Sequence, residues 1–159
     1  MANPEPREFV LAGVVLKPLV SGEQTDGQFC LLENRSGGQT KTPIHVHARD
    51  DETVYIIEGQ LTAILDGEAR TLSPGESMFL KRGIPHQLMN PGNQPVRYIL
   101  IGTPSGFEQF LAEGGRELRK QEVAGPPTPA DIERLAAAAP RFGIALLRDW
   151  PARQSDRAG

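Results

Sequence analysis

The sequence predicts an all-β domain, arranged as a barrel or sandwich, followed by short C-terminal helices. Three observations lead to this fold class. Short apolar, β-branched runs recur from residue 9 to residue 101, turns rich in Gly, Pro and Asn separate them, and no helix of normal length fits between those turns. We therefore expect a flexible N-terminus (1–8), a β-domain (9–104), a helical extension (105–149) and a flexible tail (150–159). A chain of 159 residues is long enough for one such domain with its own core.

The expected strands follow one another at short intervals. They cover residues 9–20, 29–33, 53–58, 61–65, 69–72, 77–80, 86–89 and 96–101. Between the fourth and fifth of these runs stands Asp66-Gly67, a dipeptide typical of a two-residue hairpin turn. The β-pattern ends at Gly102, and the composition after it favours helices.

Two helices are expected in the extension. The first covers residues 106–113, with Ser105 as its N-cap and Gly114 as its stop. The second covers residues 129–139, with Thr128 as its N-cap, a proline in its first turn and Pro140 as its end. The apolar face of the second helix is expected to contain Ile132, Leu135, Ala136 and Ala139.

Composition and charge exclude several classes of protein. Seventeen Lys and Arg residues against twenty Asp and Glu give a net charge of −3 without a basic cluster, so we expect no nucleic-acid partner. No apolar run is long enough to cross a bilayer, and no signal-peptide pattern precedes residues 9–20, so we expect a cytoplasmic protein without membrane contact. The single cysteine, Cys30, excludes an intramolecular disulfide and is expected to be a buried, inert thiol.

Three histidines and one glutamate indicate a metal site. His45 and His47 are two residues apart, so a strand would project both imidazoles to the same side. Glu52 follows five residues later, and His86, the third and last histidine, lies on a later expected strand. Three imidazoles and a carboxylate suit one divalent transition metal, which could be Fe, Ni, Mn, Co, Cu or Zn.

These residues occur in a pattern that resembles the two conserved motifs of the cupin superfamily. Residues 38–59 read G-x6-H-x-H-x4-E-x6-G, and residues 75–90 read G-x5-K-x-G-x2-H-x3-N. The second motif departs from the family at Lys81, where proline is common. The resemblance implies a single-domain conical β-barrel (a double-stranded β-helix) whose interior holds a metal on His45, His47, Glu52 and His86.

Strand alternation predicts the lining of a substrate pocket. If Glu52 points inward, so do Val54 and Ile56, while Thr53 and Tyr55 point outward. The same reasoning places Leu88 inside together with His86, and Phe29 and Met78 are further candidates. Each of these apolar residues could instead be barrel core only. This register places no other carboxylate inside, so Glu52 is also the candidate catalytic base.

The order of elements adds a second resemblance, to single-domain bacterial cupins related to quercetin 2,3-dioxygenase. It implies a metal-dependent dioxygenase that acts on a flavonol-like or enolic aromatic small molecule, with O2 as the co-substrate. Two alternatives remain open: a metal-assisted cyclase or isomerase of secondary metabolism, and a non-enzymatic cupin that binds a small molecule. The family also implies a homodimer, and the apolar run 9–20, which would leave an unpaired strand edge in a lone barrel, is expected to contribute to the interface.

Overall fold

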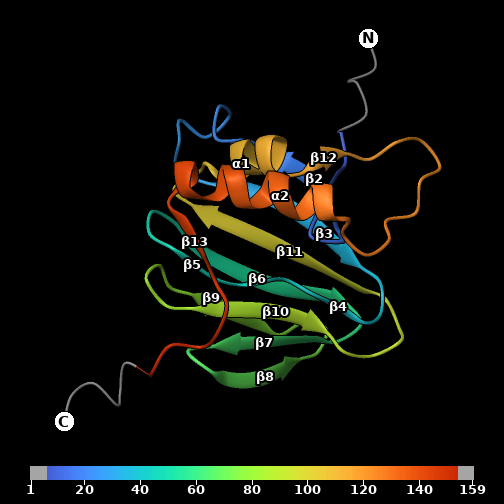
Figure 1. The fold of residues 1–159 in the computed structure, drawn as a ribbon, viewed down its shortest axis with the longest axis vertical. Helices are drawn as coiled ribbons and strands as arrows, with labels where there is room; N and C mark the ends of the chain where they lie inside the picture. Colours follow the sequence, from blue (N-terminus) through green and yellow to red (C-terminus); the bar gives the residue numbers. More distant parts are fainter. Residues whose placement is uncertain (1–6, 154–159) are drawn as a thin grey trace.

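Two antiparallel β-sheets face each other, and two short helices lie at one end of the pair (Figure 1). The computed structural model describes residues 7–153. One sheet has the strand order β12-β1-β2-β3-β11-β6-β9, and the other has the order β13-β5-β10-β7-β8, with β4 paired to β10. The expected all-β fold with short C-terminal helices is confirmed.

The elements follow the chain in an order close to the expected one. The strands are β1 (Phe9–Leu11), β2 (Val14–Val20), β3 (Cys30–Ser36), β4 (Thr40–Lys41), β5 (Ile44–His47), β6 (Asp51–Glu58), β7 (Leu61–Leu65), β8 (Glu68–Leu72), β9 (Ser77–Leu80), β10 (His86–Asn90), β11 (Val96–Thr103), β12 (Arg116–Glu117) and β13 (Ile144–Leu147). The helices are α1 (Phe107–Gly114), α2 (Pro129–Ala138) and the 3₁₀ helix η1 (Ala139–Phe142). None of these helices is long and apolar enough to cross a membrane, within the stretch that the structure describes.

The first expected strand, 9–20, is in fact a hairpin. Ala12 and Gly13 both have positive φ angles, 51° and 79°, and they turn the chain between β1 and β2. The other edge of β1 pairs with β12, so the edge that was expected to be open is covered within the chain. The stated reason for placing residues 9–20 in a dimer interface is therefore wrong, whereas the homodimer itself stays a prediction.

Alternating side chains of the central strands build the core between the sheets. Along β11, every second residue from Val96 to Gly102 is buried. Along β6, Glu52, Val54 and Ile56 are buried, whereas Tyr55 is exposed, as the sequence predicted. Cys30 is fully buried, and its burial, reinforced by the neighbouring Glu108 carboxylate, raises the pKa of the thiol to about 12. The Asp66-Gly67 hairpin joins β7 to β8 as expected, with both residues at positive φ.

The cap of α1 differs from the expected one. Its N-cap is Gly106, which has no side chain to bond, and Ser105 makes no cap hydrogen bond to the helix. The carboxylate of Glu108 accepts instead, from the backbone N–H of Gly106 at 2.9 Å and from that of Gly22 at 2.8 Å. Gly114, expected as the stop, is the last helical residue.

The second helix has the predicted cap but a different buried face. Thr128 and the carboxylate of Asp131 form a capping box at its N-terminus. Ile132 is 53% exposed and Ala136 is also exposed, contrary to expectation. The buried side of α2 contains Leu135 and Ala138 instead. Together with Ala139, the first residue of η1, they pack with Phe110 of α1 and Ile144 of β13.

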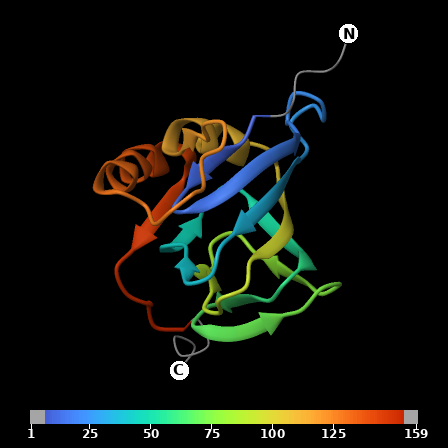
Figure 2. The same cartoon turned by 90° about the vertical axis from the view of Figure 1, so that its right-hand side faces the viewer.

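The extension also adds two strands that the sequence did not predict. β12 lengthens one sheet beside β1, and β13 lengthens the other beside β5. Figure 2 shows β13 running away from the helices along one edge of the molecule. Gly143 directly precedes β13. Its φ of 71° ends the 3₁₀ helix and redirects the chain into the strand.

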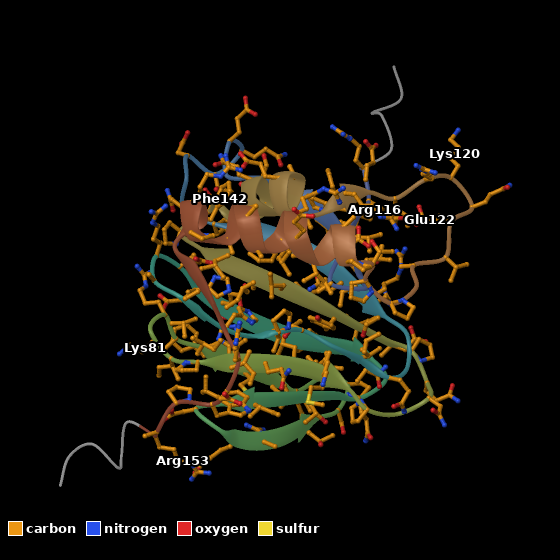
Figure 3. All side chains as sticks on the ribbon, in the orientation of Figure 1. Lys81, Arg116, Lys120, Glu122, Phe142 and Arg153 are labelled. Carbon is orange, nitrogen blue, oxygen red and sulfur yellow. The ribbon has the colours of Figure 1, made fainter. Side chains whose placement is uncertain are left out.

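Both ends of the described chain are attached to the sheets. Arg7 pairs with Glu117, and the carbonyl of Glu8 accepts from Leu118 N–H at 2.8 Å, although residues 1–8 were expected to be flexible. At the other end, Arg153 pairs with Glu68 at 2.9 Å (Figure 3). The rest of the expected flexible ends, residues 1–6 and 154–159, lies outside the described residues.

Candidate metal centre

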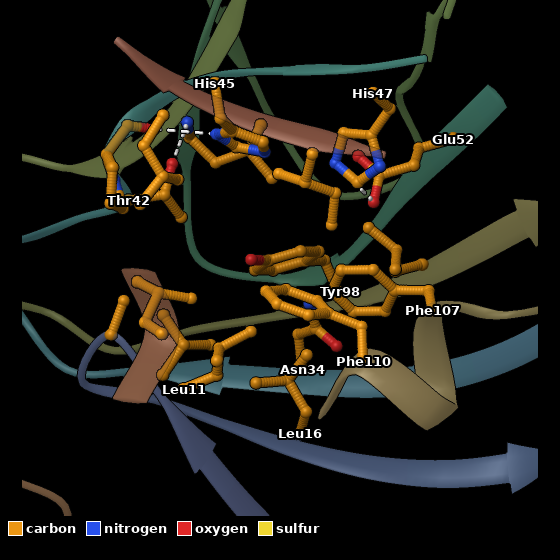
Figure 4. Close-up of a pocket in the computed structure, with 18 residues that line it drawn as sticks. Leu11, Leu16, Asn34, Thr42, His45, His47, Glu52, Tyr98, Phe107 and Phe110 are labelled. Atoms are coloured by element: carbon orange, nitrogen blue, oxygen red, sulfur yellow. Dashed lines mark hydrogen bonds and ion pairs between the residues drawn. The ribbon is translucent and has the colours of Figure 1, made fainter. Parts of the chain in front are cut away.

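The three histidines and Glu52 meet between the two sheets, and Figure 4 shows His45, His47 and Glu52 of this group. His45 and His47 project from β5, and His86 comes from the neighbouring strand β10, where it is paired in register with His45. Glu52 reaches them from β6 of the facing sheet. One donor atom from each of the four side chains lies within 4.8 Å of all the others, so the predicted ligand set is brought together.

Hydrogen bonds on the outer side of the imidazoles fix their orientation. The Nδ1–H of His45 donates to the carbonyl of Pro43 at 2.7 Å, and that of His86 donates to the carbonyl of Ile84 at 3.2 Å. An imidazole that donates from Nδ1 presents the lone pair of Nε2, and this is how outer partners prepare histidines for a metal. The acceptors are backbone carbonyls close in sequence, so the strand geometry itself sets the tautomer.

His47 has a different outer partner, Asp50. The two carboxylate oxygens of Asp50 both lie 3.1 Å from Nδ1 of His47, and both side chains are buried. The sequence interpretation placed no carboxylate other than Glu52 inside, and this was wrong. Asp50 lies in the bend between β5 and β6, where the two-residue alternation of a strand gives no information. Its position three residues after His47 was the one feature of the sequence that could have indicated a hydrogen bond between the two side chains.

The inner nitrogen of His47 provides a test of whether the residues fit a metal. Nε2 of His47 is buried and has no hydrogen-bond partner among the described residues, which is costly unless a ligand supplies one. Glu52 Oε1 lies 3.6 Å from this nitrogen, and Glu52 Oε2 lies 3.1 Å from Nε2 of His86. Three oriented imidazoles and a carboxylate converge on one point, and this donor set fits a divalent transition metal.

The charges of the buried groups depend on how they act on one another. Burial opposes the ionised form of Glu52, but the neighbouring His47 and His86 outweigh it and lower the carboxyl pKa to about 2. Burial also opposes the charge of His47, but Glu52 and Asp50 raise its pKa to about 9. Burial, followed by the charges of His86 and His47, lowers the pKa of His45 to about 3, so this imidazole is neutral. Without a metal, the centre thus contains an ionised carboxylate, a neutral His45 and a protonated His47, and a metal bound at Nε2 of His47 would displace that proton.

Two glycines of the first sequence motif lie where backbone segments approach each other closely. A Cβ on Gly59 would lie 2.3 Å from the carbonyl oxygen of Pro95, and its φ is +76°. A Cβ on Gly38 would lie 2.5 Å from the carbonyl oxygen of Gly92. Only glycine allows these close approaches. Lys81, where the second motif departs from the family, lies at an exposed turn at the edge of the molecule and is not one of the four candidate ligands (Figure 3).

Three of the four candidate ligands, His45, His47 and Glu52, line a small cavity with apolar and aromatic walls. Its volume is about 70 Å³. Figure 4 shows His45, His47 and Glu52 on one side, Leu16 and Asn34 on the other, and the ring of Tyr98 between them. The remaining lining comes mostly from the N-terminal hairpin and the C-terminal extension and consists of Leu11, Ala12, Val14, Thr42, Pro43, Leu88, Leu100, Phe107, Phe110, Leu135, Ile144 and Leu146.

One of the five predicted pocket residues, Leu88, lines this cavity. Val54 and Ile56 point inward as predicted but are fully buried in the core cluster, and Met78 packs against that cluster. Phe29 is partly buried just before β3. These four residues do not line the cavity, and three of them, Val54, Ile56 and Met78, belong to the core cluster or pack against it.

An apolar groove lies next to the cavity. Its volume is about 430 Å³, and it is lined by residues that include Ile132, Leu147 and, at its polar rim, Lys41 and Arg148. Five residues line both the groove and the cavity and so form the boundary between them: Ala12, Thr42, Pro43, Leu135 and Leu146.

Comparison with known families identifies the β-domain. Residues 32–102, which contain all four candidate ligands, match the family model of the cupin domain, Cupin_2. Residues 32–102 form a cupin domain. The cupin fold expected from the two sequence motifs is thereby confirmed.

Individual relatives of this cupin belong to different biochemical settings. The tetracenomycin polyketide synthase protein TcmJ of Streptomyces glaucescens is 32% identical over 83 residues, which are 52% of this chain and 56% of TcmJ. Quercetin 2,3-dioxygenase of Bacillus subtilis is 24% identical, over 89% of this chain and 46% of the enzyme. The chain thus spans about half the length of these two curated relatives. The crystal structure of a predicted oxalate decarboxylase from Thermotoga maritima has the same fold, with a TM-score of 0.58 and 18% identity over 65% of this chain and 99% of that one.

Proposed function

We propose that this cupin is a metal-dependent dioxygenase of the quercetinase type, which acts on a flavonol-like or enolic aromatic small molecule. The observation that carries the proposal is the contrast between the charged candidate ligands and the apolar walls of one cavity. Its charged groups are the candidate metal ligands, and most of its other walls are aliphatic or aromatic. A flat, mostly apolar molecule with one metal-binding oxygen fits such walls better than a sugar phosphate does. The similarity to quercetin 2,3-dioxygenase over 89% of the chain supports the same class.

The residues of the cavity have separate roles in this proposal. His45, His47, His86 and Glu52 would hold the metal, which when bound acts as a Lewis acid toward a coordinated hydroxyl group. Glu52 is the one carboxylate that lines the cavity among the described residues, and it accepts the proton of that hydroxyl group. Phe107 and Tyr98 provide aromatic faces for the substrate ring, and the aliphatic walls exclude water from the activated substrate.

The size of the site requires the substrate to reach beyond the cavity. A space of about 70 Å³ holds only about two water molecules, at roughly 30 Å³ each. With the adjoining groove of about 430 Å³, the site reaches the range of common ligand pockets, roughly 300–1,000 Å³. The substrate therefore enters from the groove, and the boundary side chains, among them Leu135 and Leu146, move aside to admit it.

A second candidate function is a metal-assisted cyclase or isomerase of secondary metabolism. The specific observation in its favour is the 32% identity to TcmJ, a polyketide synthase protein. The same four ligands would stabilise an enolate without O2, so the cavity walls do not distinguish the two reactions.

Oxygen consumption separates the candidates. Protein reconstituted in turn with Fe, Ni, Mn, Co, Cu and Zn is screened against flavonols and catechols in an oxygen electrode, with His86→Ala as the metal-deficient control. We expect substrate-dependent O2 uptake with at least one metal and none with His86→Ala. Turnover of an enolic polyketide under anaerobic conditions would support the cyclase instead, and binding without turnover under either condition would indicate a non-enzymatic cupin.

A further inference from the structure

We infer that Asn34 is a second anchoring point for the substrate and accepts a hydrogen bond from a hydroxyl group remote from the metal-binding oxygen. This inference rests on the proposed function and deepens it. It requires the substrate to be an aromatic molecule with at least two oxygen functions, one for the metal and one for Asn34.

The inference starts from two buried polar atoms. Among the described residues, the buried side-chain nitrogen and oxygen atoms without a hydrogen-bond partner are His47 Nε2 and Asn34 Oδ1. Both residues line the same cavity. The first atom belongs to the metal ligand set, and the second has no role in the metal centre. Figure 4 shows the two residues on different sides of the cavity.

The position of Asn34 is fixed by the sheet. It lies on β3 between Leu16 of β2 and Tyr98 of β11, each paired with it in register, and it is 3% exposed. Its side chain lies close enough to Tyr98 to act on the pKa of that phenol, and its Oδ1 has no hydrogen-bond partner among the described residues. The side chain is therefore oriented before any ligand arrives, which reduces the entropic cost of binding.

An unpaired amide oxygen at this position is costly for the fold. The next inward residue of β3 is Leu32, which is buried in the core cluster, so an aliphatic side chain is compatible with this part of the sheet. A buried acceptor without a partner destabilises the folded state, and an apolar residue of similar shape would remove that cost. A hydroxyl group of the ligand would donate a hydrogen bond to Oδ1. An analogue without this hydroxyl group would leave Oδ1 unpaired and would bind less tightly.

The other polar groups of the cavity already have partners. Thr42 Oγ1 accepts from the backbone N–H of Leu88 at 3.0 Å, and Glu52 and the histidines belong to the metal centre. Tyr98 interacts with the side chain of Asn34. Asn34 Oδ1 is thus the acceptor available for a ligand hydroxyl on that side of the cavity, within the part of the chain that the structure describes.

Two flavonols test the inference. 3-Hydroxyflavone carries only the metal-binding hydroxyketone, whereas quercetin carries additional ring hydroxyls. Binding to metal-loaded protein is measured by titration calorimetry. We expect wild type to bind quercetin at least about tenfold more tightly than 3-hydroxyflavone, because the second compound leaves Asn34 unpaired. Asn34→Leu should lose this preference while its affinity for 3-hydroxyflavone changes little.

A matched control comes from the same strand. Ser36 is the inward residue of β3 two positions after Asn34. It is buried and does not line the cavity, so Ser36→Ala should keep the preference for quercetin over 3-hydroxyflavone. A preference that survives in Asn34→Leu, or equal binding of the two flavonols by wild type, overturns the inference. If neither flavonol binds to wild type, the proposed substrate class fails, and the next measurement still decides the role of Asn34.

The second measurement needs no ligand. The double variant Asn34→Leu/Tyr98→Phe removes the amide and the neighbouring phenol hydroxyl together, so neither is left unpaired. If Asn34 is kept for a ligand, this variant should unfold at the same temperature as wild type or a higher one in calorimetry. A clearly lower unfolding temperature, with the metal content unchanged, would show that Asn34 is a structural residue and would overturn the inference.

Discussion

Asp50 holds the imidazole of His47 through both carboxylate oxygens, each 3.1 Å from Nδ1. The other two histidines of the centre have backbone carbonyls as outer partners, which no side-chain substitution can remove. His47 is thus the ligand whose orientation depends on a side chain. A substitution of Asp50 therefore tests how much the outer hydrogen bond of His47 contributes to metal binding.

Asp50→Asn should weaken metal binding without removing a ligand. Loss of an outer carboxylate typically costs about 10–100-fold in metal affinity, because the imidazole loses its fixed tautomer. The affinity is measured by competition with a chromogenic chelator. Asp51→Asn is the matched control, since Asp51 is the next residue and pairs with Arg82 outside the centre. Equal affinities of the two variants would show that Asp50 does not orient His47.

His86→Ala should abolish most metal binding. The substitution removes one of four ligands and the nitrogen that lies 3.1 Å from Glu52 Oε2, so the geometry of the remaining three is disturbed as well. Elemental analysis after reconstitution should give up to one ion per chain in wild type and much less in the variant. Met89→Ala, on the same strand but outside the ligand set, should load normally. A wild-type protein that binds no metal would contradict the enzymatic proposal as a whole.

Glu52→Gln should separate the two roles assigned to this side chain. An amide oxygen can still coordinate, so the variant should keep much of its metal, but it cannot accept a proton. Loss of a general base typically slows turnover by about 10²–10⁴-fold. Turnover and metal content are measured on the same preparation. Near-normal turnover of the metal-loaded variant would show that Glu52 acts only as a ligand.

Leu146→Trp should slow the entry of substrate from the groove. Leu146 lies at the boundary between groove and cavity, on β13 opposite His45, and a larger side chain there narrows the passage. Stopped-flow measurement of flavonol binding should give a lower association rate with an unchanged metal content. Ala145→Trp, on the outward side of the same strand, should bind as wild type does. An unchanged rate in Leu146→Trp would place the entry elsewhere.

Glu108→Gln should destabilise the protein in a pH-dependent way. Burial opposes the charge of Glu108, but the backbone N–H groups of Gly22 and Gly106 hold its pKa below the ordinary value. A pKa that is lower in the folded state gives stability above the unfolded pKa of about 4.3, and this stability is lost as the pH falls through the folded value. Urea unfolding at neutral pH should therefore show a loss of about 1 kcal/mol. The difference between variant and wild type should shrink as the pH falls below 4, and a constant difference would contradict the assigned cause.

The sequence alone was sufficient to name the four candidate ligands, through their match to two family motifs and through rules that are local. His45 and His47 face the same side of a strand since they are two residues apart, and the inward positions of Glu52, Val54 and Ile56 follow from the same alternation. The fold class followed from the spacing of turns, and the cap at Thr128 followed from a four-residue pattern.

The tertiary structure decided which inward residues face a cavity and which fill the core. Alternation assigns Val54 and Leu88 equally to the interior, yet only Leu88 also lines the cavity, because what each inward side chain meets depends on packing across the two sheets. Asp50 lies in a bend, where no periodicity predicts the direction of a side chain. The wall formed by Leu146 depends on the pairing of β13 with β5 about a hundred residues earlier, and such long-range pairing leaves no pattern within either segment.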